Sequence, residues 1–302
     1  MLDRISLDQL RTFMAAADEG SFSAAGRRLS RTQSAVSEAI GALEMHLGVT
    51  LFDRSGRFPR LTSEGIVLLA DARQVLSSVD GMKARAKGMT AGIEPELAVV
   101  IEALFPIEAL ASAARDFRLH FPMTPLRLYV EVLGAAVEPV LDGMASFGIA
   151  GFVPELPPGL VTEYLASVRV LMVAAASHPL AAWRGIIPKE ELARHVQLVL
   201  TDRSKLTQGR EFAVMSTSTW RLADLFAKHA FLLNGLGWGG MPRHTVEADL
   251  KAGRLVELEI EDVPAGGMAL AMSAVYRAAD PPGPAGRWMI ERLKGCRDNL
   301  NK

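Results

Sequence analysis

The sequence is poor in cysteine and lacks both a long apolar run and an excess of charge of one sign. Its single cysteine, Cys296, cannot form a disulfide within the chain, which fits a reducing compartment. No stretch reaches the roughly 18 uninterrupted apolar residues of a membrane-spanning helix. The segment Met1–Ile5 begins no apolar run of signal-peptide length. We therefore expect a cytoplasmic protein with no membrane partner.

Patterns of catalytic and metal-binding residues are also scarce. The six histidines are scattered, and no pair has the spacing of a metal site. The sequence contains no Gly-x-Ser-x-Gly elbow, and the glycine run Gly235–Gly240 lacks the Lys-Ser/Thr pair of a phosphate-binding loop. We expect no catalytic residue, no metal and no cofactor, so the chain is not expected to be an enzyme.

The remaining bulk properties are those of a folded protein with a local rather than a global charge bias. The chain has 302 residues, of which 49% are hydrophobic and 22% are charged. That length corresponds to about two domains of roughly 150 residues each. Because the net charge is −1, any surface that binds nucleic acid must be confined to one region.

The first 90 residues have the period and the caps of four helices. Ser21, Thr32 and Thr62 can each accept an amide hydrogen at the start of a helix. Short apolar pieces at 51–52 and 58–61 flank the basic segment Arg54–Arg57, which predicts a two-stranded wing. The expected helices cover residues 7–19, 21–29, 32–47 and 62–87, with a Gly- and Pro-containing hinge at 88–95.

Two helices joined by a short turn, the second with polar residues at its start, form the arrangement that reads the DNA major groove. Gln33 can pair with adenine, and six arginines against three acids give the segment Ser21–Arg60 a local charge of +3. The alternative is a helical bundle with a solvated polar face. The expected DNA-binding residues are Arg28, Arg31, Thr32, Gln33, Ser34, Ser37, Glu38, Arg54 and Arg57.

After residue 96 the pattern changes to alternating strands and helices, which predicts βαβ units and a parallel sheet. The expected strands are 97–101, 126–132, 147–152, 168–175, 197–200 and 268–276, and the expected helices are 106–119, 135–144, 222–229, 245–252 and 286–294. Ligands in such folds bind beyond the carboxyl ends of strands. Arg203, just after one strand, can pair with a carboxylate, although a plain solvated loop is an equal alternative.

The N-terminal residues resemble those of a known family. The matching pattern is Leu10-x-x-Phe13, Gly20-Ser21-Phe22-Ser23-x-Ala25, Leu29, Gln33-Ser34-Ala35-Val36-Ser37-x-x-Ile40, Leu43-Glu44-x-x-Leu47-Gly48, Leu51-Phe52-x-Arg54 and Leu61-Thr62-x-x-Gly65. This pattern is similar to the N-terminal region of LysR-type transcriptional regulators. Weaker similarity covers Val140–Gly151, His178–Leu180 and Leu233–Pro242.

The resemblance implies an α/β chain with an N-terminal all-α winged helix-turn-helix, a long linker helix and a C-terminal αβ effector domain like periplasmic binding proteins. The implied domains are 1–61 for DNA binding, 62–90 for the linker and dimerisation helix, and 91–302 for effector binding. Within the last, subdomain I comprises 91–162 and 268–302, and subdomain II comprises 163–267.

The resemblance further implies a regulator that binds double-stranded promoter DNA under the control of a small-molecule effector, for which Arg203 suggests a small organic acid. A homo-oligomer, dimer or tetramer, is implied, and RNA polymerase is a candidate partner. Two departures from the family pattern are Glu38 and the apolar loop Ala103–Phe105. The expected effector-binding residues are Ala103, Leu104, Phe105, Leu133, Phe147, Thr201, Asp202, Arg203, Gly237 and Trp238.

Overall fold

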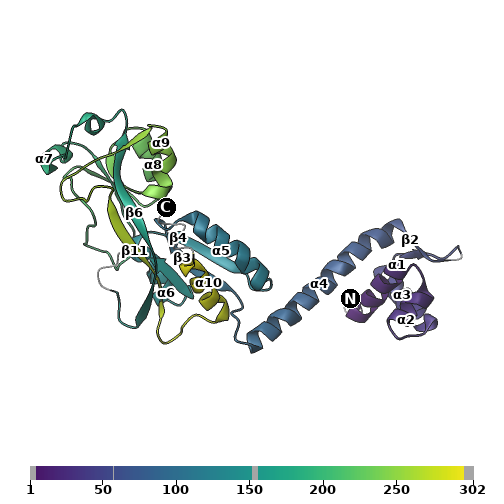
Figure 1. Cartoon of the computed structure of the whole chain (residues 1–302). Coiled ribbons are helices and arrows are strands. Elements are labelled where there is room, and N and C mark those ends of the chain that lie inside the picture. Colours follow the sequence, from purple (N-terminus) through teal and green to yellow (C-terminus); the bar gives the residue numbers. More distant parts are fainter. Residues whose placement is uncertain (1–4, 57, 152–155, 296–302) are drawn as a thin grey trace. The chain divides into compact units, whose positions relative to one another are not determined.

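The computed structural model describes residues 5–56, 58–151 and 156–295 of the chain (Figure 1). Arg57 and Cys296, both singled out from the sequence, lie outside these residues. The chain divides into two compact units, Met1–Lys87 and Gly88–Lys302. Among the described residues, no helix has both the length and the apolarity needed to cross a membrane.

The first unit is built from four helices and a small hairpin. Its elements are α1 (Leu7–Glu19), α2 (Phe22–Arg28), α3 (Gln33–Leu47), β1 (Phe52–Asp53), β2 (Arg60–Leu61) and α4 (Ser63–Thr90). The expected caps are present: Ser21 and Thr32 accept the amide hydrogens of Ala24 and Ala35. Ser6, which was not expected from the sequence, forms a reciprocal capping box with Gln9.

Aromatic packing holds the helices of the first unit to the hairpin. The ring of Phe52 on β1 makes edge-to-face contacts with Phe13 and Phe22, at centroid distances of 5.7 and 5.2 Å. Gly26 allows the tight turn between α2 and α3, because a Cβ at this position would lie 2.7 Å from the carbonyl oxygen of Arg31. The second helix of the pair, α3, is thereby fixed against α2 while its first turn stays exposed.

The described residues of the second unit form one mixed sheet of nine strands. Its strands are β3 (Leu97–Glu102), β4 (Leu126–Glu131), β5 (Phe147–Ala150), β6 (Leu160–Ala175), β7 (Gln197–Leu200), β8 (Thr219–Leu222), β9 (Trp238–Pro242), β10 (Leu255–Glu257) and β11 (Met268–Arg277). The order is β4-β3-β5-β11-β6-β9-β7-β8, with β10 also paired to β6. The long strand β6 pairs with β11 along Leu160–Val170 and with β9 along Val170–Ala174, so it joins the two halves of the sheet.

The first half of the sheet, β4-β3-β5 with β11, forms a first lobe with helices on both faces. Helices α5 (Ile107–His120) and α10 (Pro284–Lys294) lie side by side on one face (Figure 1). Their apolar residues, including Phe117 and Met289, pack with Ile101 of β3 in one buried cluster. The short helices η1 (Leu133–Ala136) and α6 (Glu138–Leu141) pack through Ala136 and Val140 against Val100, on the other face.

The second half, β9-β7-β8 with the end of β6, forms a second lobe. Alternate residues of β6 enter different cores: Leu171 packs with α8 (Leu225–Leu233) and α9 (Arg243–Lys251), whereas Met172 packs on the opposite side. The opposite side is covered by η2 (Pro179–Ala182) and α7 (Lys189–Leu192), through Leu180 and Leu192. Strand β6 is therefore buried on both faces at this end.

The observed architecture agrees with the expected α/β class, but three local expectations are wrong. The sheet is mixed rather than parallel, because β11 and β6 run antiparallel to their neighbours. The expected helix 135–144 is split, since η1 ends at Ala136 and α6 ends before Gly143, which has a left-handed φ of 74°. The expected strand 168–175 is only the second half of β6.

Candidate nucleic-acid interface and ligand cavities

The first turn of α3 presents polar side chains to solvent. Thr32, Gln33 and Ser34 are exposed, and Ser37 is partly exposed one turn later. The Thr32 hydroxyl oxygen accepts the amide hydrogen of Ala35 at 3.2 Å and bonds the Ser34 hydroxyl at 3.0 Å. Because a helix N-terminus carries unpaired amide hydrogens, this turn suits both base edges and a phosphate.

Two of the expected DNA-binding residues, Arg28 and Arg31, are paired with acids. Nη1 and Nη2 of Arg31 donate to the two oxygens of the Asp8 carboxylate, at 2.7 and 2.8 Å. The hydrogen bond from Arg31 is the main cause that lowers the pKa of Asp8. Arg28 lies 3.2 Å from Glu19. These pairs are exposed and screened by solvent, so they orient the arginines beside α3 and are weak enough to exchange for phosphate.

Arg54 is held more firmly than a free phosphate-binding residue would be. Its Nη2 lies 2.8 Å from Glu44 Oε2, its Nη1 donates to Ser37, and its guanidinium lies 5.3 Å from the centre of the Phe22 ring. The other carboxylate oxygen of Glu44 accepts the amide hydrogens of Leu51 and Phe52. Glu44 therefore ties the end of α3 to β1, a contact that the sequence did not predict.

In the second unit, the carboxyl ends of β3, β4, β7 and β8 are followed by loops that meet between the lobes. The amide hydrogen of Ala135, in η1, is accepted by the Asp202 carboxylate at 3.0 Å, and that of Lys205 by Glu138 at 2.7 Å. A Cβ on Gly134 would collide with the Ser204 hydroxyl. Close backbone approach and charged hydrogen bonds thus join the lobes at this point.

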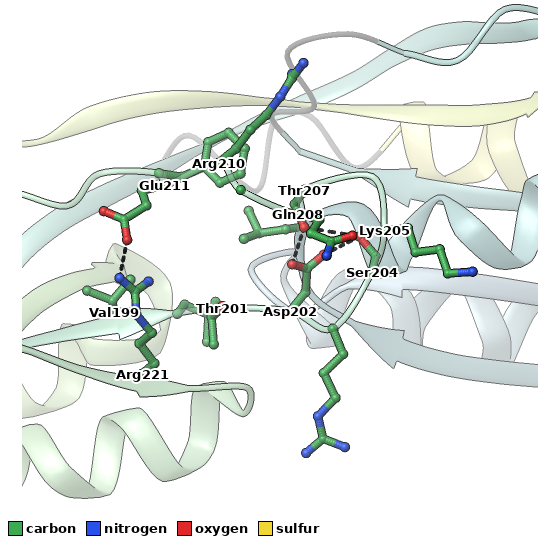
Figure 2. Close-up of a pocket in the computed structure, with 15 residues that line it drawn as sticks. Val199, Thr201, Asp202, Ser204, Lys205, Thr207, Gln208, Arg210, Glu211 and Arg221 are labelled. Atoms are coloured by element: carbon green, nitrogen blue, oxygen red, sulfur yellow. Dashed lines mark hydrogen bonds and ion pairs between the residues drawn. The ribbon is translucent and has the colours of Figure 1, made fainter.

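A first cavity of about 480 Å³ lies beyond the end of β7 (Figure 2). It is lined by Leu133, by the end of β7, by residues 201–205 and 207–212 of the loop that follows, and by Arg221. Asp202 accepts hydrogen bonds from Ser204 and Thr207 on one side, and Arg221 pairs with Glu211 on the other (Figure 2). The basic lining residues are Arg203, Lys205, Arg210 and Arg221, which outnumber the acids Asp202 and Glu211.

Four of the ten expected effector-binding residues line this cavity: Leu133, Thr201, Asp202 and Arg203. The other six do not line it. Phe105 and Phe147 are buried in the core of the first lobe, against which Leu104 also packs, and the amide of Ala103 bonds the Glu131 carbonyl of β4. Gly237 packs against the Val196 backbone, and Trp238 is buried in the second lobe.

Trp220 is exposed, whereas Trp238, one of the expected effector-binding residues, is a core residue. The glycine run Gly235–Gly240 continues into β9. Gly239 is needed there because a Cβ would lie 2.5 Å from the Leu198 carbonyl oxygen of β7. Glycine-rich segments have low strand propensity, which explains why this strand was missed.

Glu102, the last residue of β3, is a buried acid that the sequence analysis did not select. It is 1% exposed, its Oε2 accepts the amide hydrogen of Leu133 at 2.8 Å, and its Oε1 has no hydrogen-bond partner. Burial, with a contribution from the nearby Asp202 charge, raises the pKa of Glu102 to about 7. The signal in the sequence was a single acid at the end of an otherwise apolar strand.

Family comparisons cover nearly the whole chain. The profile described as "Bacterial regulatory helix-turn-helix protein, lysR family" matches residues 7–66. The profile described as "LysR substrate binding domain" matches residues 90–296, which is more than half of the chain. Within the described residues, no group of three or more histidine, cysteine or acidic residues is arranged to hold a metal ion.

Individual relatives are distant but similar over most of their length. The chain is 27% identical over 298 residues to the HTH-type transcriptional regulator AceR of Acinetobacter baumannii, covering 97% of this chain and 98% of AceR. It is 29% identical over 257 residues to the uncharacterized HTH-type transcriptional regulator YeeY of Escherichia coli, covering 84% and 83%. Among solved structures, OxyR from Corynebacterium glutamicum shares the fold with a TM-score of 0.60 and 23% identity, covering 98% of this chain and 94% of OxyR.

Proposed function

Because the chain belongs to the LysR family of DNA-binding transcriptional regulators with a substrate-binding domain, we propose which of its residues read promoter DNA and which bind the effector. The exposed first turn of α3, Thr32–Ser34 with Ser37 and Glu38, enters the major groove of double-stranded DNA. Arg28 and Arg31 contact phosphates on either side. The observation that carries this assignment is that the polar turn is exposed while Val36, Ile40 and Leu43 of the same helix pack into the core.

Arg54 has a positioning role in this proposal, with its exposed edge directed to the DNA backbone. Its bonds to Glu44 and Ser37 fix the wing beside α3. The proposal places residues 1–61 in DNA binding and residues 62–90 in a linker helix. It places the chain in the cytoplasm, as a regulator rather than an enzyme, with RNA polymerase as a further partner.

We infer that α4 also associates two copies of the chain. Val75, Met82 and Met89 are exposed apolar residues that recur every seven positions along α4. Apolar residues at this spacing form the seam of a coiled coil. This seam supports a homodimer, and a homotetramer follows if the second units also associate.

The first prediction concerns base reading. Gln33→Ala is expected to reduce the preference for target over scrambled DNA by about 1–3 kcal/mol, because the side-chain amide that pairs with adenine is lost. The measurement is fluorescence anisotropy of the full chain on duplex DNA from upstream of its own gene and on a scrambled duplex. Gln74→Ala, an exposed glutamine on α4, is the matched control. Equal preference in wild type and Gln33→Ala would contradict the assignment.

The second prediction concerns the effector. A small organic acid is proposed to bind in the cavity beyond β7, with its carboxylate on Arg203, because basic residues dominate the lining. Carboxylic acids that bind are expected to raise the melting temperature of the full chain, and Arg203→Gln to weaken binding at least about tenfold. Arg184→Gln, an exposed arginine outside the cavity, should bind as wild type does. If a carboxylic acid raised the melting temperature of Arg203→Gln as much as that of the wild type, this placement of the effector would be contradicted.

A further inference from the structure

The short helix η1 is held by one carboxylate from each lobe. The amide hydrogen of Leu133, at its start, is accepted by Glu102 Oε2 of the first lobe at 2.8 Å. The amide hydrogen of Ala135, two residues later, is accepted by Asp202 Oδ2 of the second lobe at 3.0 Å. Leu133 has a left-handed φ of 52°, which is strained for a residue with a Cβ and persists only where neighbouring contacts hold it. Glu102 and Asp202 therefore fix this helix together.

The two carboxylates have unequal surroundings. Besides the Ala135 amide, Asp202 accepts hydrogen bonds from the hydroxyl groups of Ser204 and Thr207 (Figure 2). Glu102 is 1% exposed, and its Oε1 has no hydrogen-bond partner. A buried carboxylate oxygen that lacks both a partner and water is costly when the group carries charge. Of the two acids, Glu102 is therefore the one whose charged form the junction stabilises less.

No base offsets the charge of Glu102 within the described part of the chain. The charged side chains on the elements packed around it are Glu131 of β4, Glu138 of α6, and Asp202, Arg203 and Lys205 of the loop after β7. Strand β5 and η1 contain no titratable side chain. Neither Arg203 nor Lys205 pairs with Glu102, and Figure 2 shows Lys205 directed away from Asp202. The charge that acts on Glu102 from the second lobe is that of Asp202.

Ionised Glu102 is therefore unfavourable while the lobes are joined. Burial, together with the Asp202 charge, raises the pKa of Glu102 to about 7, although the backbone amides of Leu133 and Leu104 favour its ionised form. Below about pH 7 the joined lobes contain a neutral Glu102, and above it they contain two carboxylates that repel each other. Separation of the lobes at η1 relieves this repulsion, because it lets water reach both groups.

We propose that Glu102 is a positioning residue for η1 and that its proton controls the junction between the two lobes. With the proton bound, the Ala135–Asp202 bond stays closed; when the proton leaves, this bond opens more often. The consequence for ligands rests on the proposed function, since Leu133 and Asp202 also line the cavity assigned to the effector. An anionic effector there binds more tightly below about pH 7, because it does not meet the charge of Glu102.

The test is amide hydrogen exchange of the full chain without ligand, between pH 6 and pH 8. Rates are divided by those of unfolded peptides, because free amides also exchange faster as the pH rises. We expect the protection of segment 131–137 to fall about tenfold from pH 6 to pH 8, as the ionised fraction of a group with a pKa of about 7 rises about tenfold. Helix α10, on the opposite face of the sheet, should keep its protection. Since no ligand is used, failure here is distinct from failure of the effector assignment.

Variants separate the proton of Glu102 from its positioning role. Glu102→Gln keeps an oxygen for the Leu133 amide and does not titrate, so segment 131–137 should be equally protected at both pH values. Glu102→Ala loses that oxygen and should protect the segment poorly at both. Glu257→Gln, an exposed acid on β10, should respond to pH as the wild type does. Asp202→Asn removes the facing charge and should move the midpoint of the pH response below that of the wild type.

Three results would overturn the inference. The first is equal protection of segment 131–137 at pH 6 and pH 8 in the wild type. The second is a pH response that persists in Glu102→Gln, which would assign it to another group. The third is wild-type protection in Glu102→Ala at pH 6, which would exclude the positioning role.

Discussion

Replacing Glu44 by alanine is expected to lower the free energy of unfolding of the first unit by about 2–4 kcal/mol. The Glu44 side chain is 15% exposed, and its Oε1 accepts the amide hydrogens of Leu51 and Phe52 at 2.8 and 3.1 Å. Both of those residues are buried, so alanine leaves two amides with little access to water. The partly exposed pair with Arg54 adds less, because solvent screens it.

The same substitution should weaken binding to every DNA sequence, because the wing is then no longer fixed beside α3. Tyrosine and tryptophan are absent from residues 1–87, so the unfolding of this unit is best followed by hydrogen exchange of the segment 49–54. Glu38→Ala, an exposed glutamate on the same helix, is the control for stability. If the amides of residues 49–54 were equally protected from hydrogen exchange in Glu44→Ala and Glu38→Ala, Glu44 would not hold the hairpin.

Replacing Glu102 by glutamine is expected to stabilise the second unit by up to about 3 kcal/mol at pH 8, with a much smaller effect at pH 5. Burial raises the pKa of Glu102 from its ordinary value of 4.5 to about 7 in the folded chain. The folded state therefore holds this proton more tightly than the unfolded state does. The contribution of Glu102 to the free energy of unfolding is therefore largest below about pH 4.5. It decreases as the pH rises and is lost above about pH 7. Glutamine does not titrate and removes that loss.

All four tryptophans, Trp183, Trp220, Trp238 and Trp288, lie in the second unit, so tryptophan fluorescence in urea reports its unfolding selectively. The difference in stability between Glu102→Gln and wild type should grow between pH 5 and pH 8, while other titrating groups cancel in the difference. Glu257→Gln, an exposed acid, should show no such growth. If the difference in unfolding free energy between Glu102→Gln and wild type did not change with pH, Glu102 would be ionised over the whole range from pH 5 to pH 8. The proposed rise in its pKa would then be contradicted.

The first unit was largely predictable because its determinants are local. Helix starts are marked by Ser21 and Thr32, and the turn between α2 and α3 depends on Gly26, all close together in the sequence. The contact that was missed, between Glu44 and β1, joins residues seven and eight positions apart, across the end of a helix. Its signal was an acid near the end of α3, where the helix dipole disfavours negative charge.

The second unit was less predictable because its site depends on contacts between distant segments. Glu102, Leu133 and Asp202 meet only when the carboxyl ends of β3 and β7 are brought together. Leu133 and Thr201–Arg203, which the sequence assigned to effector binding, line a cavity because they follow strands, and their role in binding stays a prediction. Phe105 and Trp238, also assigned to effector binding, lie in core clusters, since a large apolar side chain after or within a strand suits a core as well as a cleft.

The central claim is that the exposed first turn of α3 reads DNA sequence. The most direct test is selection of bound duplexes from a randomised DNA library by the full chain at physiological salt, in parallel for wild type and Gln33→Ala. The account predicts enrichment of one defined motif by the wild type, with affinity that falls as salt increases, and loss of preference at one base pair per half-site with Gln33→Ala. No enriched motif for the wild type, or an identical motif for the variant, would contradict it.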